Sequence, residues 1–261
     1  MIKYNTPQEL FTAICDKIRD KTNSNELINH QDIPDKIDNL VSSGIINEYN
    51  ELLSMINQNT IIELNNNEIE NINICFIGCT SLTTIDLPKC ATIGWGVFQN
   101  CASLTTINLP ECTSIREYGF SCCTSLTTVN LPECTSIGNS AFNSCASLTT
   151  IDLPKCTSIG GAFSYCASLT TIDLPKCTSI RNYAFQNCTS LATIILSSNQ
   201  MVTLKNTNAF YNTPIANGTG YIYVPDNLVD SYKTATNWST YANQIKPISE
   251  LPSNLKEEYN L

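Results

Sequence analysis

The chain has 261 residues, with 14 basic and 23 acidic side chains, a formal net charge of −9 and a single histidine, His30. This acidic balance argues against nucleic acid or an anionic membrane as a partner, because both attract clustered lysine and arginine. One histidine excludes any site that needs two imidazoles from one chain. No apolar run reaches the roughly 18 residues that a membrane span requires, so we expect no membrane insertion.

Residues 1–44 are predicted to form a pair of helices. Thr6-Pro7-Gln8-Glu9 has the pattern of a capping box with proline at the first helical position. An apolar stripe from Leu10 to Ile18 follows, and Asp32-Ile33-Pro34 begins the second helix. Residues 13–37 resemble the N-terminal helical pairs of gut Firmicutes and tailed-phage proteins, which implies an assembly or attachment module.

Residues 45–60 are predicted to form a connecting amphipathic helix. Ile45, Tyr49, Leu52 and Ile56 follow one another at steps of 4, 3 and 4, which is a heptad spacing of about two heptads. Two interpretations stay open. The helix packs on its neighbours in the same chain, or residues 1–60 join copies of the chain into a homo-oligomer.

Residues 61–220 contain an internal repeat, which the 14 cysteines mark most clearly. Two cysteine columns advance in steps of 22 residues, with one step of 21 in each. The columns are Cys79, Cys101, Cys123, Cys145, Cys166 and Cys188, and Cys90, Cys112, Cys134, Cys156 and Cys177. Leucine and phenylalanine keep the same period, which is typical of a solenoid whose rungs bury their apolar faces on one another.

Within each rung, the pattern L-x-x-I-x-L predicts one strand, as in Leu82, Ile85 and Leu87. A proline follows directly and ends the strand, because it cannot donate to the ladder. Equivalent strands are expected to pair in parallel. The one short step lies between Ile159 and Phe163, in a variable stretch that is expected to be a loop.

The repeat L-T-T-I-D-L-P-K-C-T-S-I at 169–180 and its copies, each followed by A-F or a variant, resemble the BspA-like branch of the leucine-rich repeat superfamily, of the gut bacterial or phage-associated type. The resemblance implies an α/β solenoid of about six to seven 22-residue rungs. It also implies a parallel sheet on the concave side, an N-terminal helical module and a C-terminal helical cap. Members of this family are bacterial surface, adhesion or phage-associated binding proteins rather than enzymes.

Residues 221–248 are predicted to close the array, since a terminal rung would otherwise expose its core. Tyr221 to Pro225 have the pattern of a last strand, and Asp226 begins a helix that runs to about Ala235. Trp238, Tyr241 and Ile245 follow at helical spacing. This segment resembles the one after many BspA-like arrays. Residues 249–261 are expected to form a tail.

No catalytic, cofactor or metal site is predicted. The two cysteine columns are separated by about 11 largely extended residues, so they cannot share a zinc ion. Neighbours within a column are one rung apart, which disfavours disulfides. We therefore expect buried, reduced thiols, with Cys122 as the most reactive thiol. His30 lies far in sequence from these cysteines, and no phosphate-binding motif is present.

Two surfaces are candidates for binding a partner. The outward strand positions form a threonine column, in which the candidates are Thr84, Thr106, Thr128, Thr150 and Thr171. The loops vary more between copies and carry Trp95, Tyr118, Tyr165 and Tyr183, residue types that are enriched in binding hot spots. The threonine column also has a purely structural explanation in the preference of strands for threonine.

The predicted function is therefore non-enzymatic recognition of a protein or a glycan, for adhesion or host interaction. The alternative is a structural subunit of a phage or surface assembly that oligomerises through its N-terminal helices. The first 20 residues lack the pattern of a signal peptide, which predicts a cytoplasmic or virion-associated location. The family resemblance predicts the cell surface instead.

Overall fold

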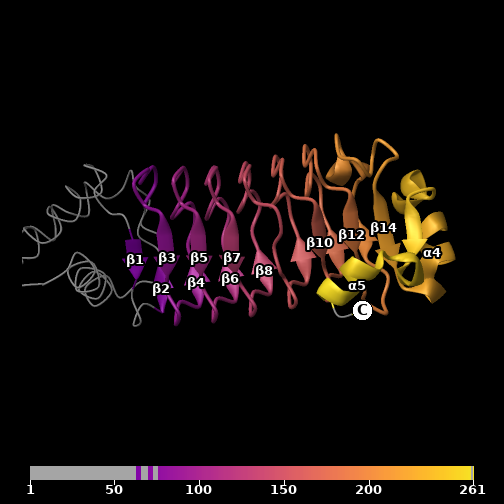
Figure 1. Cartoon of the computed structure of the whole chain (residues 1–261), viewed down its shortest axis with the longest axis horizontal. Helices are drawn as coiled ribbons and strands as arrows, with labels where there is room; N and C mark the ends of the chain where they lie inside the picture. The colour runs from indigo at the N-terminus through magenta and orange to yellow at the C-terminus, as the bar shows by residue number, and fades with distance from the viewer. Residues whose placement is uncertain (1–62, 66–69, 73–75, 260) are drawn as a thin grey trace, which may run out of the picture.

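The computed structural model describes residues 63–65, 70–72, 76–259 and 261. These residues form a parallel β-solenoid of about eight turns of about 22 residues, slightly more than the predicted six to seven. The turns stack in a nearly straight row along the long axis (Figure 1). The helical pair predicted for residues 1–44 and the connecting helix predicted for 45–60 lie outside the described residues.

A typical turn contributes two short strands, which belong to different sheets. The first strand has mostly three residues: β1 (Glu63–Asn65), β3 (Thr84–Asp86), β5 (Thr106–Asn108), β7 (Thr128–Asn130), β10 (Thr171–Asp173), β12 (Thr193–Ile195), β14 (Tyr221–Val224) and β15 (Ile245–Pro247). The second has two: β2 (Asn71–Ile72), β4 (Thr92–Ile93), β6 (Ser114–Ile115), β8 (Ser136–Ile137), β9 (Ser158–Ile159), β11 (Ser179–Ile180) and β13 (Thr203–Leu204).

The first strands form two four-stranded parallel sheets, ordered β1-β3-β5-β7 and β10-β12-β14-β15. Between them, the turn that contains Asp152 makes a single parallel bridge, from Asp152 to Asp173. The second strands form one seven-stranded parallel sheet, ordered β13-β11-β9-β8-β6-β4-β2. The predicted parallel sheet is confirmed. The second sheet was not predicted, because two-residue strands are too short to show an alternating pattern.

The core is a set of ladders of identical side chains. Seven phenylalanine rings stack from Phe76 to Phe210, with centroids of successive rings 5.3–6.0 Å apart and ring planes within 16° of parallel. The leucines and isoleucines of the repeat and both cysteine columns are buried beside them. Each turn therefore removes its apolar surface from water only by lying against the turns on either side.

The C-terminal cap closes this phenylalanine stack. Phe210 packs against Trp238 and meets Tyr241 edge-on, with the Phe210 and Tyr241 centroids 5.3 Å apart. Trp238 donates from Nε1 to the Val202 carbonyl at 2.7 Å. The Val202 amide in turn donates to the Tyr232 hydroxyl at 2.9 Å. The last turn thus gains both an apolar lid and partners for its backbone.

The helical elements of the cap are shorter than predicted. The 3₁₀ helix Asp226–Leu228 leads into α4 (Val229–Thr234), and Trp238–Tyr241 is a separate 3₁₀ helix. Ile245 was expected at helical spacing but lies in β15, which pairs with β14. Tyr221–Val224 is therefore not the last strand, because β15 pairs with its outer edge. No helix of the described residues is long and apolar enough to cross a membrane.

The tail predicted for residues 249–261 is wrong for its described part. The 3₁₀ helix Ile248–Glu250 and α5 (Ser253–Tyr259) fold back over β10 and β12 (Figure 1). Leu251 forms a second, small core with Ile195 and Tyr223. Leu255 and Tyr259 of α5 pack against this core. The signal was an isoleucine at position 195, where the preceding rungs place Asp or Asn on the outer face.

The phenylalanine stack predicts a large penalty for removing a ring from its middle. We expect Phe142→Ala to lower the free energy of unfolding by about 3–5 kcal/mol, and Phe142→Leu to lower it much less. Phe142 touches rings on both sides at 5.5 Å, so alanine leaves a cavity between two turns. Urea unfolding followed by circular dichroism measures the difference. A cost for Phe142→Ala below about 1 kcal/mol would contradict the stack as the main contact between turns.

Candidate binding surface

The outward side chains of the first strands form a polar surface, which we call the strand face. Asn108 donates from Nδ2 to Asp86 Oδ1 at 2.7 Å, and Asn130 donates in the same way to Asn108 Oδ1 at 2.6 Å. These groups are one turn apart and satisfy one another. The face therefore carries a hydrogen-bonded ladder rather than a row of open donors and acceptors.

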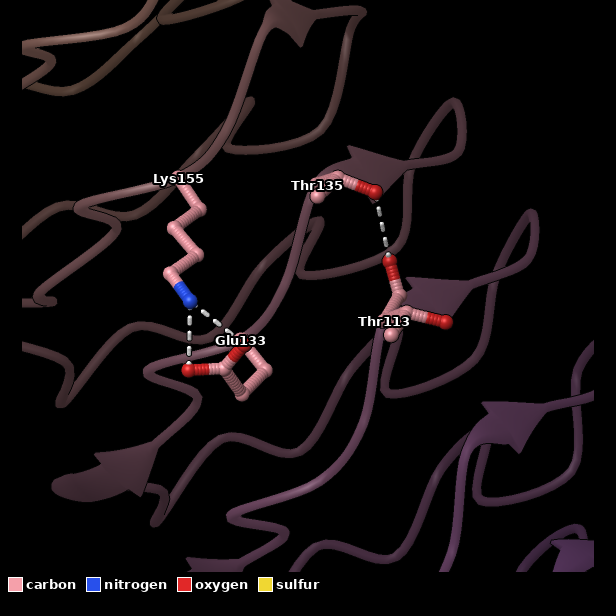
Figure 2. Close-up of polar contacts among 4 residues, drawn as sticks. All are labelled: Thr113, Glu133, Thr135 and Lys155. Carbon is pink, nitrogen blue, oxygen red and sulfur yellow. Dashed lines mark hydrogen bonds and ion pairs between the residues drawn. The ribbon is translucent and has the colours of Figure 1, made fainter.

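Polar pairs outside the strand face also link neighbouring turns. Lys155 forms an ion pair with Glu133 at 2.6 Å, and the Thr135 hydroxyl donates to the Thr113 carbonyl at 3.2 Å (Figure 2). Several other threonine hydroxyls donate to the backbone of the preceding turn in the same way, including Thr105, Thr127 and Thr178. Both partners of the ion pair are about half exposed, so it contributes little to stability.

The C-terminal end of the strand face is covered. Thr171 is only 9% exposed and Ile195 is fully buried, at the place where α5 lies over β10 and β12 (Figure 1). Thr128 and Thr150 are exposed, and Thr84 and Thr106 are half-buried. Of the five predicted threonines, Thr171 is therefore not available to a partner, because the folded-back segment occupies that end of the face.

The four predicted aromatic residues lie on the stretches that follow each second strand, residues 94–100, 116–122, 138–144, 160–165 and 181–187, which we call the turn edge. Their exposed fractions are 45% for Trp95, 36% for Tyr118, and 50% each for Tyr165 and Tyr183. Trp95 and Tyr118 are in edge-on contact, with centroids 5.6 Å apart. Tyr165 and Tyr183 line one open groove. The structure thus brings the four together as two pairs.

Three of these residues adopt a backbone conformation that disfavours bulky side chains. Tyr118, Tyr165 and Tyr183 have φ values of 60°, 62° and 60°, in the left-handed region. The same two places in other turns hold mostly small or amide residues: Gly96 and Ser140 in one column, and Gly78, Asn100, Cys122, Ser144, Asn187 and Asn212 in the other. Tyrosine at these positions costs local conformational energy, which is a reason to look for function there.

Gly138 allows two neighbouring turns to approach closely and does not have a left-handed backbone. A Cβ on Gly138 would lie 2.5 Å from the Glu117 amide nitrogen. Gly138 is thus required by the close approach of the preceding turn, and the left-handed positions are the ones given above.

The described cysteines do not form a metal or redox centre. In one column each thiol from Cys101 onward donates to a carbonyl of the preceding turn, as Cys123 Sγ does to the Phe98 oxygen at 3.2 Å. In the other the acceptor is two residues ahead, as for Cys134 Sγ and the Ser136 oxygen at 3.5 Å. All eleven column cysteines are free and buried, as predicted. Burial raises the pKa of Cys134 and Cys123 to about 12, so neither is a nucleophile near neutral pH. No group of three or more potential metal ligands occurs in the described chain.

The structure adds one feature that the sequence did not indicate. The short turn at 159–163 leaves an open groove beside Tyr165 and Tyr183, and Lys205 of a later turn reaches into its lining. Lys205 belongs to a turn of irregular length, so the repeat gave no sign that it lies near Arg181. His30, Cys15 and Cys75 lie outside the described residues.

A model of the family described as BspA type leucine rich repeat region matches residues 53–161 and 113–243 of the chain. A search of curated proteins found no match.

Solved structures of bacterial leucine-rich repeat proteins are similar to this one. A leucine-rich cell surface protein of Faecalibacterium prausnitzii is 34% identical over 55% of this chain and 39% of that one, with a TM-score of 0.48. A leucine-rich repeat protein of Bacteroides ovatus is 29% identical over 60% and 47%, with a TM-score of 0.44. The T. pallidum leucine-rich repeat protein is 26% identical over 66% and 81%, with a TM-score of 0.50. The chain thus spans less than half of the first two proteins.

Thiol burial predicts a selective pattern of alkylation. Cys122 is the one described cysteine that is not buried, so we expect iodoacetamide to modify it in the native protein much faster than any column cysteine. Mass-spectrometric mapping before and after addition of guanidinium chloride reports each position separately. Cys122→Ser is the control that removes the fast site. Native-state modification of Cys134 at a comparable rate would contradict the burial of the column.

Asp173 predicts a pH dependence of stability at the end of the strand face that α5 covers. Burial, with a smaller contribution from the neighbouring Asp152 carboxylate, raises the pKa of Asp173 from 3.8 to about 6. The folded state therefore binds the proton more tightly than the unfolded state. Its contribution to stability is fully present below pH 3.8 and is lost as the pH rises through 6.

We therefore expect Asp173→Asn to raise the free energy of unfolding at pH 7 by about 1–2 kcal/mol. The gain is smaller than the raised pKa alone would give, because the carboxyl is only half-buried and water screens its charge. Urea unfolding at pH 7 and pH 4.5 measures this, and the gain should shrink at the lower pH. Asp86→Asn, the same change in the same column far from α5, controls for the loss of one charge. An equal gain at both pH values would contradict the assignment.

Proposed function

The chain belongs to the BspA-type leucine-rich repeat family, and we propose that it is a non-enzymatic recognition protein that binds its partner along the turn edge. Leucine-rich repeat proteins are typically non-catalytic binding proteins. The observation that carries the proposal is the placement of three exposed tyrosines at left-handed backbone positions. Their rings are held outward at a cost to local conformational energy, which folding alone does not require.

The turn edge is a better candidate than the strand face. On the strand face, Asp86, Asn108 and Asn130 hydrogen-bond to one another, and α5 covers one end. On the turn edge, Trp95, Tyr118, Tyr165 and Tyr183 present large, rigid side chains with polar atoms beside them. Such aromatic anchors supply most of the binding energy in many interfaces.

The partner class is a protein or a glycan, in adhesion or host interaction. An extended solenoid offers a long row of similar binding positions, which suits a polymeric or repetitive ligand. The proposal requires no cofactor and assigns no catalytic residue.

The test uses substitutions that remove the rings without straining the backbone. The triple variant Tyr118→Asn, Tyr165→Asn and Tyr183→Asn should fold with equal or greater stability, because asparagine tolerates the left-handed region better than tyrosine. We expect it to lose at least tenfold in affinity for whichever partner a glycan array or a pull-down with the intact chain identifies.

A matched variant probes the strand face. Thr128→Glu with Thr150→Glu adds charge to that face and leaves the turn edge unchanged. Loss of binding in the threonine variant together with full binding in the tyrosine variant would contradict the turn edge as the recognition surface.

A further inference from the structure

The turn edge contains one interruption, at the turn that is a residue shorter than its neighbours. Between Ile159 and Phe163 the chain reads Gly-Gly-Ala, where the following turn reads Arg-Asn-Tyr-Ala. An open groove of about 770 Å³ lies over this short turn. A Cβ on Gly161 would lie 3.4 Å from the Asn182 carbonyl oxygen, in ordinary contact with the next turn, so a side chain is sterically accepted at this position in the lining of the groove.

Two tyrosines from different columns of the repeat line this groove. Tyr165 and Tyr183 come from successive turns and occupy different left-handed columns, yet both line the same space and are half exposed. Tyr165 is fixed by a hydrogen bond from its amide to the Gln186 carbonyl at 2.7 Å. The Tyr183 carbonyl accepts from the Ser164 hydroxyl at 2.6 Å. The backbone of both residues is thus tied into the wall of the groove.

The charge of the groove is opposite to that of the chain. Arg181 and Lys205 line it, and no acidic residue does, although the chain has a net charge of −9. Both cations are exposed, and neither forms an ion pair with another described residue. Asn139, which lines the groove, donates from Nδ2 to the Glu117 carboxylate at 3.3 Å. Unpaired cations in a recess attract an anionic group.

The remaining lining consists of amides and hydroxyls. Asn182 and Gln186 face the groove, and neither side chain hydrogen-bonds to another described residue. No aliphatic side chain lines the groove. A protein partner is normally held by an apolar interface core, which this surface lacks. Aromatic rings with free amides instead suit a ligand that presents flat C–H faces and many hydroxyl groups.

We infer that this groove binds an acidic carbohydrate, a sugar chain that carries carboxylate or sulfate groups. The tyrosine rings stack on sugar faces, Arg181 and Lys205 bind the anionic group, and Asn182 and Gln186 hydrogen-bond to hydroxyls. The inference rests on the proposed function and names the ligand class of one part of the turn edge.

The test is a calorimetric titration of the full chain with tetragalacturonate and with its methyl ester, in which each carboxylate is replaced by a neutral ester. We expect binding of the free acid and at least tenfold weaker binding of the ester. A carrageenan tetrasaccharide, which carries sulfate and no carboxylate, distinguishes the two anionic groups. Tighter binding of either acidic sugar than of the neutral ester supports the inference.

Single variants assign the binding to the groove. Arg181→Gln and Lys205→Gln should each weaken binding of the preferred acidic sugar about tenfold and reduce its salt dependence. Tyr183→Asn should weaken it by a similar factor while keeping or raising thermal stability. Gly161→Leu should block the groove. Lys176→Gln and Tyr211→Asn remove an exposed cation and an exposed ring elsewhere and should leave the affinity unchanged.

Three outcomes would overturn the inference. They are binding of the ester as tight as that of both acidic sugars, tighter binding of a tetraglutamate peptide than of either acidic sugar, and no binding of any acidic sugar. The proposed function fails separately, when the triple tyrosine variant retains its partner. Loss of that partner together with no acidic-sugar binding would leave the turn edge as the recognition surface and remove the acidic carbohydrate as its ligand.

Discussion

The structure depends on the repetition of identical side chains between parallel turns. A turn of about 22 residues cannot bury its apolar side chains within itself, so each Phe, Leu and Cys must meet its own copy in the next turn. The phenylalanine rings, with centroids 5.3–6.0 Å apart, are the largest of these contacts. This constraint fixes the interior and leaves the surface columns free to vary. The proposed recognition surface accordingly lies at the edges of the turns.

The same stacking allows residues to hold strained conformations. The backbone of the turn edge is hydrogen-bonded from turn to turn, as in the bond from the Tyr118 amide to the Asn139 carbonyl at 3.1 Å. Because neighbouring turns determine the left-handed conformation, the residue type at these positions has little influence on whether the turn forms. Glycine and asparagine relieve the strain, whereas tyrosine leaves it in place and gains an outward ring. The solenoid thus tolerates tyrosine at left-handed positions of the turn edge, which an isolated loop would not.

The elements that recur in every rung could be predicted from the sequence, whereas those beyond the last regular rung could not. The strands around Ile85 and its copies, the buried cysteines and the helical cap could be predicted, since each is marked in several rungs at once. Residues 248–259 could not, although Ile248, Leu251 and Leu255 are spaced as on one helical face. Their partner, Ile195, differs from its column in a single rung. Arg181 and Lys205 follow Ile180 and Leu204, which pair between neighbouring turns. The step between those turns departs from the period of the repeat, so a linear pattern does not reveal the pairing.

The location of the groove follows from which part of a turn tolerates a change in length. Loss of one residue from a strand would reverse the inward and outward side chains of that strand. Around the short turn, Ser158 and Ile159 instead keep their register with Ser136 and Ile137 on one side and with Ser179 and Ile180 on the other. The second strand and the buried core thus keep their register at the short turn, although the first strands are interrupted in the same turn, where Asp152 makes a single bridge. In a solenoid of this kind, a recess between exposed aromatic residues arises at little cost in stability, and its lining is then set by the turns on either side.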